Sequence, residues 1–227
     1  MAILTMSMLI VGTSGLDSNE IFDPCLDAKV EKGDGFTFGI AFSSKEAFFK
    51  DEIQYSPCDT RLALASKSAQ LALFRPMVDE ISLLTINTTT FNPVLSGGYM
   101  VAFAGRKYAA RSFPIMIADN THTITSFTLV LEFQQGTLQN LYWKSFGCES
   151  CVGDSSVCLN NQDCAVPNSK CKNNHGGGSV DCDIGIQLTF SGMDRNLEAL
   201  NSWYEVNNLR RFSLYGLYSG ISDAVTL

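Results

Sequence analysis

Six of the eight cysteines lie between positions 148 and 182, and this cluster constrains the fold of the 227-residue chain more than any other feature. The stretch "CESCVGDSSVCLNNQDCAVPNSKC" separates its cysteines mostly by Asn, Asp, Ser and Gly, so it cannot fold by burying apolar surface. The cysteines of the cluster are Cys148, Cys151, Cys158, Cys164, Cys171 and Cys182, and the other two are Cys25 and Cys58. An even count in a polar segment predicts disulfides, which persist in oxidising compartments.

Two other uses of the cysteines fit the spacing less well. A structural zinc site usually brings two close ligand pairs, and only Cys148 and Cys151 form such a pair. The second pair would have to come from Cys158/Cys164 or Cys171/His175. A redox pair at Cys148 and Cys151 would need to begin a helix after a strand, and the flanking residues do not read that way. We therefore expect four disulfides, no metal and no cofactor.

The connectivity of the disulfides is open, because eight cysteines allow 105 pairings. Cys25 and Cys58 stand apart and are expected to tie down the N-terminal segment. Cys148 ends one strand-like run and Cys182 begins another. If those strands are neighbours, a bridge from Cys148 or Cys151 to Cys182 would close the neck of the loop.

Two further features agree with secretion. The apolar run from Ile3 to Val11, followed by small residues, predicts a signal peptide over residues 1–15 and a single domain over 16–227. No Lys or Arg precedes Lys29, so the alternative is a first β-strand. The lone glycosylation sequon, Asn87-Thr88-Thr89, falls where a strand meets a turn, which predicts a surface glycan on Asn87.

The remaining sequence predicts a mainly β domain. Phe36, Phe38, Ile40 and Phe42 alternate with other residues, and similar short runs recur between Gly, Pro, Asn and Asp turns. About nine strands indicate a single-domain β-sandwich or jelly roll with the cysteine-rich segment 148–182 inserted between two strands. The most clearly patterned hairpin runs from Thr123 to Trp143.

Short helices are expected at two places. Ser43 and Glu46 match a capping box before "AFF". Asp194 is a candidate N-cap for a helix that would place Leu197, Leu200 and Tyr204 on one face.

Charge excludes one class of partner. The net charge is −7 with a pI of about 4.8, and no extended Lys/Arg run is present, whereas nucleic-acid binding needs a basic face. No apolar run reaches the roughly 20 residues that span a bilayer. We expect neither a nucleic-acid partner nor a membrane span.

The sequence carries no recognised catalytic motif. It lacks G-x-S-x-G, H-E-x-x-H and Walker-type loops, and His122 and His175 have no partner motif. A pair of carboxylates is the remaining route to catalysis, as in glycoside hydrolysis. The candidates are Glu80, Glu132, Asp194 and Glu205, although any domain of this size has such residues.

Aromatic residues suggest binding instead. Tyr142, Trp143, Trp203 and Tyr204 gather in the C-terminal half, and exposed aromatic faces can stack on sugar rings. Each of them could equally fill the core.

Several stretches resemble a family of uncharacterised secreted plant proteins of the extracellular and cell-wall fraction. The likeness runs from about Phe36 to Ser219 and is carried by "AQLALFRPMVDEISLLTINTTTFNP", "GGYMVAFAGRKYAARS", "FTLVLEFQQGTLQNLYWK", "VCLNNQDCA", "CDIGIQLTFSGMD" and "LNSWYEVNNLRRFSLYGLYSG". The resemblance implies secretion, a single domain and cell-wall association, and it carries over no functional residue.

These observations favour a secreted, disulfide-stabilised binding or structural protein of the plant extracellular matrix. Its expected ligand is a cell-wall polysaccharide or another extracellular protein, and binding is favoured over enzymatic activity. The alternative is a secreted glycan hydrolase that uses paired carboxylates.

Overall fold

The chain folds mainly into β-strands, as predicted. The computed structural model describes residues 17–211 except 63, 65–68, 109, 146, 152–154 and 173–176. Within this part it contains fourteen strands and one α-helix, more strands than the nine expected. The strands are β1 (Phe38–Ser43), β2 (Phe49–Lys50), β3 (Ile53–Gln54), β4 (Gln70–Phe74), β5 (Ser82–Ile86), β6 (Tyr99–Phe103), β7 (Ile115–Met116), β8 (His122–Ile124), β9 (Ser126–Gln134), β10 (Thr137–Lys144), β11 (Val157–Leu159), β12 (Asp163–Pro167), β13 (Ile184–Met193) and β14 (Ala199–Leu200).

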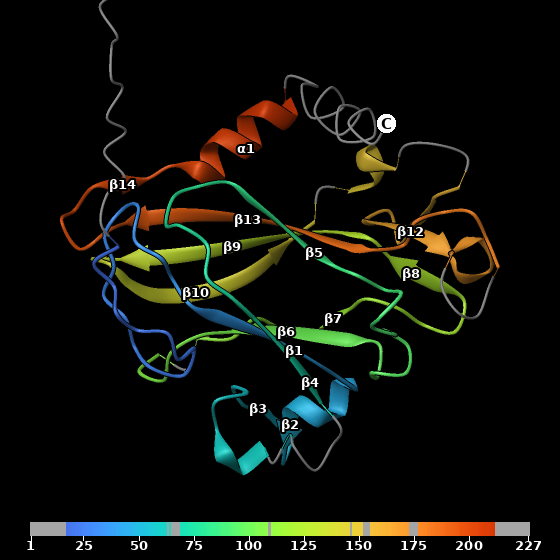
Figure 1. The fold of residues 1–227 in the computed structure, drawn as a ribbon, viewed down its shortest axis with the longest axis horizontal. Coiled ribbons are helices and arrows are strands. Elements are labelled where there is room, and N and C mark those ends of the chain that lie inside the picture. Colours follow the sequence, from blue (N-terminus) through green and yellow to red (C-terminus); the bar gives the residue numbers. More distant parts are fainter. Residues whose placement is uncertain are drawn as a thin grey trace, which may run out of the picture.

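The strands form four sheets (Figure 1). One has the order β4-β1-β6-β7, and a second has the order β10-β9-β13-β14 with β5 also paired to β13. A three-stranded sheet, β11-β12-β8, lies at one end, and the small β2-β3 sheet lies at the margin (Figure 1). The helix α1 (Ser202–Arg211) contacts β13.

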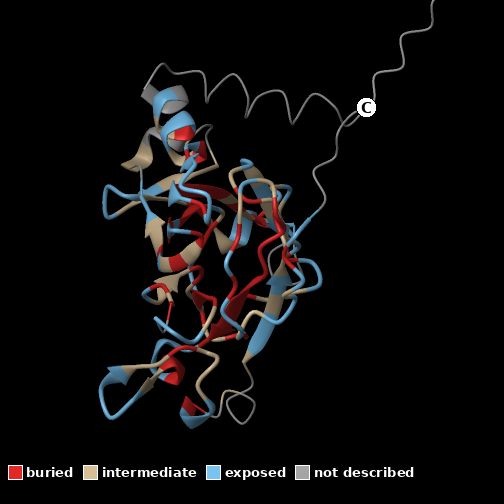
Figure 2. Ribbon diagram, turned by 90° about the vertical axis from the view of Figure 1, so that its left-hand side faces the viewer, coloured by how far each residue is buried: buried red, intermediate tan, exposed pale blue. Residues whose placement is uncertain are grey.

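The two large sheets contribute to one hydrophobic core. Phe38 and Ile40 of β1 belong to the same buried cluster as Leu129 of β9 and Leu188 of β13. In Figure 2 the buried positions gather in the interior, and the exposed ones lie on loops and outer strands. Alternate residues of a strand face opposite sides, so the period-two pattern around Phe38 correctly predicted this burial.

The strand order separates two strands that the sequence suggested as neighbours. The predicted hairpin is confirmed as β9 and β10, which pair antiparallel. However, β13 pairs with β9 in parallel, so β9 lies between β10 and β13. The end of β10 and the start of β13 are therefore about 9.5 Å apart, two strand spacings.

The bridge to Cys182 was expected if these strands were neighbours, and neither the neighbouring strands nor the bridge is found. All eight cysteines are paired, as expected, and Cys25 joins Cys58. Neither Cys148 nor Cys151 bonds to Cys182. The other pairs are Cys148–Cys158, Cys151–Cys164 and Cys171–Cys182. The bridges in this part of the chain therefore join cysteines that are 10 to 13 residues apart. The pairing also rules out a redox couple between Cys148 and Cys151.

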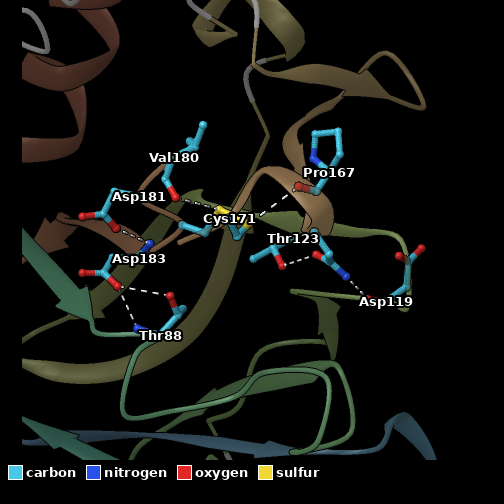
Figure 3. The surroundings of a disulfide bond; sticks show 10 residues. Thr88, Asp119, Thr123, Pro167, Cys171, Val180, Asp181 and Asp183 are labelled. Atoms are coloured by element: carbon cyan, nitrogen blue, oxygen red, sulfur yellow. Dashed lines mark hydrogen bonds between the residues drawn. A yellow bond between two sulfur atoms is a disulfide. The ribbon is translucent and has the colours of Figure 1, made fainter. Parts of the chain in front are cut away.

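The buried Cys171–Cys182 bridge fixes the segment that leads into β13 (Figure 3). The next residue, Asp183, accepts hydrogen bonds from the backbone N–H of Thr88, at 2.7 Å, and from its hydroxyl. On the other side of Cys171, the Thr123 hydroxyl donates to the side-chain oxygen of Asn168 (Figure 3). The side-chain nitrogen of Asn168 donates to the carbonyl of Asp119. The disulfide segment is thus attached to two turns of the main domain.

Both predicted helix starts differ from the structure. Residues Lys45–Phe48 form a single 3-10 turn, η1, and no side-chain hydrogen bond caps it. Asp194 is buried and closes a turn, where it accepts backbone hydrogen bonds from Lys32, Asn196 and Glu198.

The start of α1 is capped instead by a distant residue. Asp79 accepts hydrogen bonds from the backbone N–H groups of Asn201 and Ser202, at 2.6 and 2.8 Å. Because Asp79 lies 122 residues before Asn201, this contact cannot be predicted from the residues around the helix start.

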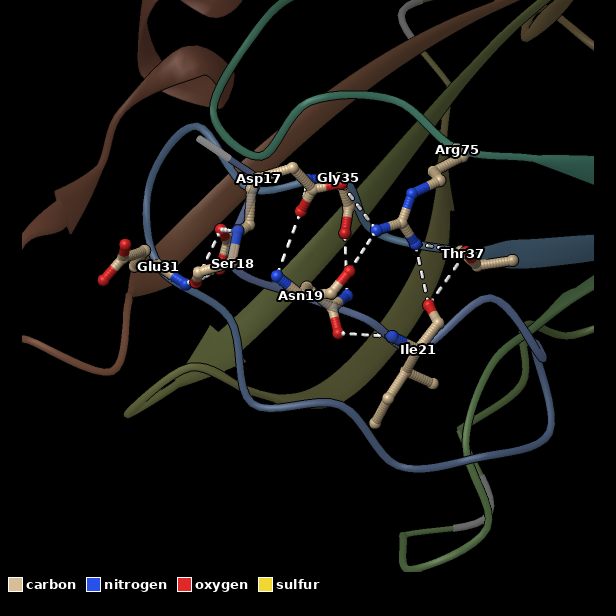
Figure 4. A network of polar contacts seen from close by, with 9 residues as sticks. Asp17, Ser18, Asn19, Ile21, Glu31, Gly35, Thr37 and Arg75 are labelled. Carbon is tan, nitrogen blue, oxygen red and sulfur yellow. Dashed lines mark hydrogen bonds and ion pairs between the residues drawn. The ribbon is translucent and has the colours of Figure 1, made fainter. Parts of the chain in front are cut away.

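A polar network holds the segment that begins at Asp17 against the domain (Figure 4). The buried Asp34 carboxylate accepts hydrogen bonds from both the backbone and the hydroxyl of Ser18. Arg75 donates to the Asp17 carboxylate, the Ile21 carbonyl and the Thr37 hydroxyl. The expected signal peptide at 1–15 lies outside the described residues.

The connectivity can be tested by mapping peptides under non-reducing conditions. We expect Cys25–Cys58, Cys148–Cys158, Cys151–Cys164 and Cys171–Cys182, and no free thiol in the denatured, unreduced protein. Recovery of Cys182 joined to Cys148 or Cys151 would contradict this pairing.

Candidate functional site

A groove between the small β2-β3 lobe and the loop after β6 is the candidate site. Its cavity volume is about 440 Å³, which lies within the roughly 300–1,000 Å³ typical of small-molecule sites. Its lining includes Gln54, Tyr55, Asp59, Arg61, Arg106 and Arg111. We refer to it as the arginine groove.

Arg61 is held in place by two neighbours. Its Nε and Nη2 atoms donate to the two carboxylate oxygens of Asp59, at 2.9 and 2.5 Å. Its guanidinium carbon lies 4.3 Å from the centre of the Tyr55 ring. A planar guanidinium suits both contacts, because it forms paired hydrogen bonds and stacks on aromatic faces.

Arg106 is positioned through its backbone. Its N–H donates to Asp27 Oδ1 at 2.8 Å, and the preceding Gly105 donates to the carbonyl of Pro24. Gly105 has φ +71°, and a Cβ there would lie 2.6 Å from Asp27 Oδ1, so the turn requires glycine. The exposed Arg106 side chain forms no hydrogen bond or ion pair with another described residue.

Arg111 joins the two walls of the groove. Its Nε and Nη2 donate to the backbone carbonyl of Gln54, at 3.1 and 2.8 Å, and the Gln54 side chain donates to the carbonyl of Ser112. The Cys25–Cys58 disulfide anchors the same lobe. The groove is therefore braced by hydrogen bonds and by one covalent link.

The charge of the groove opposes that of the protein. Of the described residues that line it, three carry guanidinium groups and one carries a carboxylate, whereas the net charge of the whole chain is −7. The Arg61 guanidinium, through its side-chain hydrogen bonds, lowers the pKa of Asp59 to about 2. Asp59 therefore stays ionised and paired with Arg61 at neutral pH.

The four aromatic residues predicted to bind sugar do not share one surface. Tyr142 and Trp143 are adjacent on β10 and so point to opposite sides of the sheet. Trp143 packs against the hydrophobic core, edge-on to Phe127, and its indole N–H donates to the buried Ser112 hydroxyl at 2.9 Å. The cavity beside Trp143 is about 20 Å³, enough for about one water molecule.

The other aromatic residues lie near α1. Burial raises the pKa of Tyr142, and the negative charges of Glu132 and of ionised Tyr204 raise it further. Tyr204 is exposed and Trp203 is half-buried on α1. None of the four lines the arginine groove.

The candidate carboxylates are also dispersed. Glu80, Glu132 and Glu205 are exposed, on the segment before β5, on β9 and on α1 respectively. Burial alone would raise the pKa of Asp194, but the three backbone N–H donors outweigh it and the pKa is lowered. A carboxyl group that must donate a proton needs the opposite shift.

The remaining predicted residues have local roles or lie elsewhere. His122 is half-buried on β8 and its Nδ1 lies 2.8 Å from the Thr121 hydroxyl. His175 lies outside the described residues. Asn87 is exposed directly after β5, as predicted, and a glycan on it stays a prediction.

Sequence reasoning missed the three arginines of the groove. Arg61 is separated from the others by more than 40 residues, and only the fold brings it beside them. The one local signal was the basic stretch "GRKYAAR", residues 105–111, within an acidic chain.

Trp143 is expected to act in stability. Trp143→Ala should lower the free energy of unfolding by about 2–3 kcal/mol, because it removes the packing of a half-buried side chain against the core and its hydrogen bond to Ser112. Tyr204→Ala, at an exposed position, should change it by less than about 0.5 kcal/mol. Urea denaturation followed by circular dichroism measures both, and an unchanged midpoint for Trp143→Ala would contradict this role.

The Asp59–Arg61 pair predicts a pH dependence. The folded-state pKa of Asp59, about 2, is below its ordinary value of 3.8, so the stabilisation is present above about pH 4 and is lost as the pH falls through about 2. NMR titration of the Asp59 carboxyl should give this midpoint, and Arg61→Gln should raise it. A wild-type midpoint near 4 would show that the pair does not form.

Comparison with known proteins identifies a family without a described activity. No curated protein and no solved structure matches the chain. The family model described as "Uncharacterised protein DDB_G0273449" matches residues 1–125 and 115–223, nearly the whole chain. The chain therefore belongs to the family of uncharacterised protein DDB_G0273449.

Proposed function

We propose that the chain is a secreted binding protein of the plant extracellular matrix or cell wall, built as a β-sandwich, that holds its ligand in the arginine groove. Four disulfides indicate an oxidising, extracellular environment. Secretion and the cell wall are further supported by the N-terminal apolar run and by the resemblance of the sequence to secreted plant proteins. Among the described residues, no helix is long and apolar enough to cross a membrane.

The observation that carries the proposal is the preorganised basic lining of the groove. The Arg61 side chain is paired with Asp59 and lies over the Tyr55 ring. The backbone N–H of Arg106 donates to Asp27. The Arg111 side chain donates to the carbonyl of Gln54. Groups that are fixed before binding lose less conformational freedom when a ligand arrives. Two guanidinium groups are thus held before binding while the exposed Arg106 side chain can reach a ligand, which suits retention of an extracellular polysaccharide or protein.

The geometry favours binding over glycoside hydrolysis. A hydrolase needs one carboxyl group that donates a proton and a second carboxylate at a fixed separation. Among the described residues, Asp59 is the one carboxylate that lines the groove, and with a pKa of about 2 it holds no proton to donate near neutral pH. The exposed Glu80, Glu132 and Glu205 do not line it.

Retention on insoluble wall polysaccharide tests the proposal. Arg106→Gln should weaken binding about tenfold, the effect of losing about 1.4 kcal/mol from one charged hydrogen bond. The fold should be unchanged, because the backbone of Arg106, and not its side chain, bonds to Asp27. Lys172→Gln is the matched control, since it removes one positive charge from an exposed residue outside the groove.

Three outcomes would contradict the proposal. Equal loss in both variants would indicate general charge attraction, and no retention of the wild type would exclude a polysaccharide ligand. Release of reducing sugar that Glu80→Gln or Glu132→Gln abolishes would favour the hydrolase.

A further inference from the structure

We infer that the ligand of the arginine groove is a carboxylate-bearing polysaccharide, one built from uronic acid residues. This inference rests on the proposed function and names the chemical class of its ligand. The groove is a basic site on an acidic protein, so a polyanion that the rest of the surface repels would be attracted here.

The arginines have the geometry that carboxylates require. A guanidinium presents paired N–H donors to the two oxygens of a carboxylate, as Arg61 already does to Asp59. The Arg106 side chain is exposed at the groove and can make the same contact with a ligand. Arg61 keeps donors beyond those bound to Asp59, because a guanidinium carries five N–H groups.

A neutral sugar would find less to bind. Neutral rings are commonly held against an exposed aromatic face, and Tyr55 is the aromatic residue of the lining. Arg61 covers one face of the Tyr55 ring at 4.3 Å. That face presents a cation in place of an apolar surface, so recognition through charge is favoured over stacking.

The lining favours a sugar over an acidic peptide. Thr60, which is exposed, and Gln54 place a hydroxyl and an amide beside the arginines, and these can bond to sugar hydroxyls. Peptide sites usually add apolar pockets for side-chain anchors. Here the lining side chains other than Tyr55 and Cys58 are polar or charged, apart from Gly105.

Calorimetry on the full chain with paired polymers tests the inference. The probes are polygalacturonate, the same polymer with its carboxyl groups methyl-esterified, a neutral xylan and polyglutamate, all with a chelator to remove calcium. We expect binding to polygalacturonate that is at least tenfold tighter than to the other three and weakens with added salt. Arg106→Gln should reduce it about tenfold, and Lys172→Gln should leave it within twofold.

The outcomes separate this inference from the proposed function. Equal affinity for the esterified and free polymers, with loss in Arg106→Gln, would overturn the uronate assignment and leave the polysaccharide-binding role intact. Equal affinity for polyglutamate and polygalacturonate would show that the site binds carboxylates on any polymer backbone, which would overturn the assignment of a sugar ligand. Binding to none of the polysaccharides would overturn both.

Discussion

The parallel pairing of β13 with β9 determines how the rest of the chain is arranged. With β9 in the centre, β10 occupies one side and β13 the other, and β13 in turn pairs with β5 and β14. The segment that connects β10 to β13 must therefore cross the end of the sheet at which β9 begins. The cysteine-rich segment makes this passage, and its strand β12 pairs with β8, which leads into β9. Backbone pairing thus attaches a polar segment that has little apolar surface of its own.

The disulfides serve two separate parts of the molecule. Cys25–Cys58 joins residues that are 33 positions apart and anchors the lobe beside the arginine groove. In the chain-entropy model, closing a loop of this length stabilises the folded state by about 3.5–4 kcal/mol. The other three close separations of 10 to 13 residues within the passage from β10 to β13. The groove and the cysteine-rich segment are therefore stabilised by different covalent links.

Features with local causes were predictable from the sequence, and features with distant causes were not. The burial of Phe38 and Ile40 and the β9–β10 hairpin follow from patterns among neighbouring residues, and the structure confirms both predictions. The hydrogen bonds from the start of α1 to Asp79 could not be predicted, because Asp79 comes from another part of the chain. The disulfide pairing was missed because it depends on strand order. The groove was missed for a similar reason, since Arg61 meets Arg106 only in the folded chain.

The positions of Cys158 and Cys164 have a consequence for how the protein matures. They stand directly opposite each other in the β11-β12 hairpin, yet each is bonded to a partner in or beside the 3-10 turn at Gly147–Ser150. Because they are only six residues apart, a bond between them closes a short loop and would form readily during oxidation. The native pairs would then arise by thiol–disulfide exchange, which is slow without an isomerase. The same hairpin that docks the segment thus makes the protein dependent on a compartment that can correct its bonds.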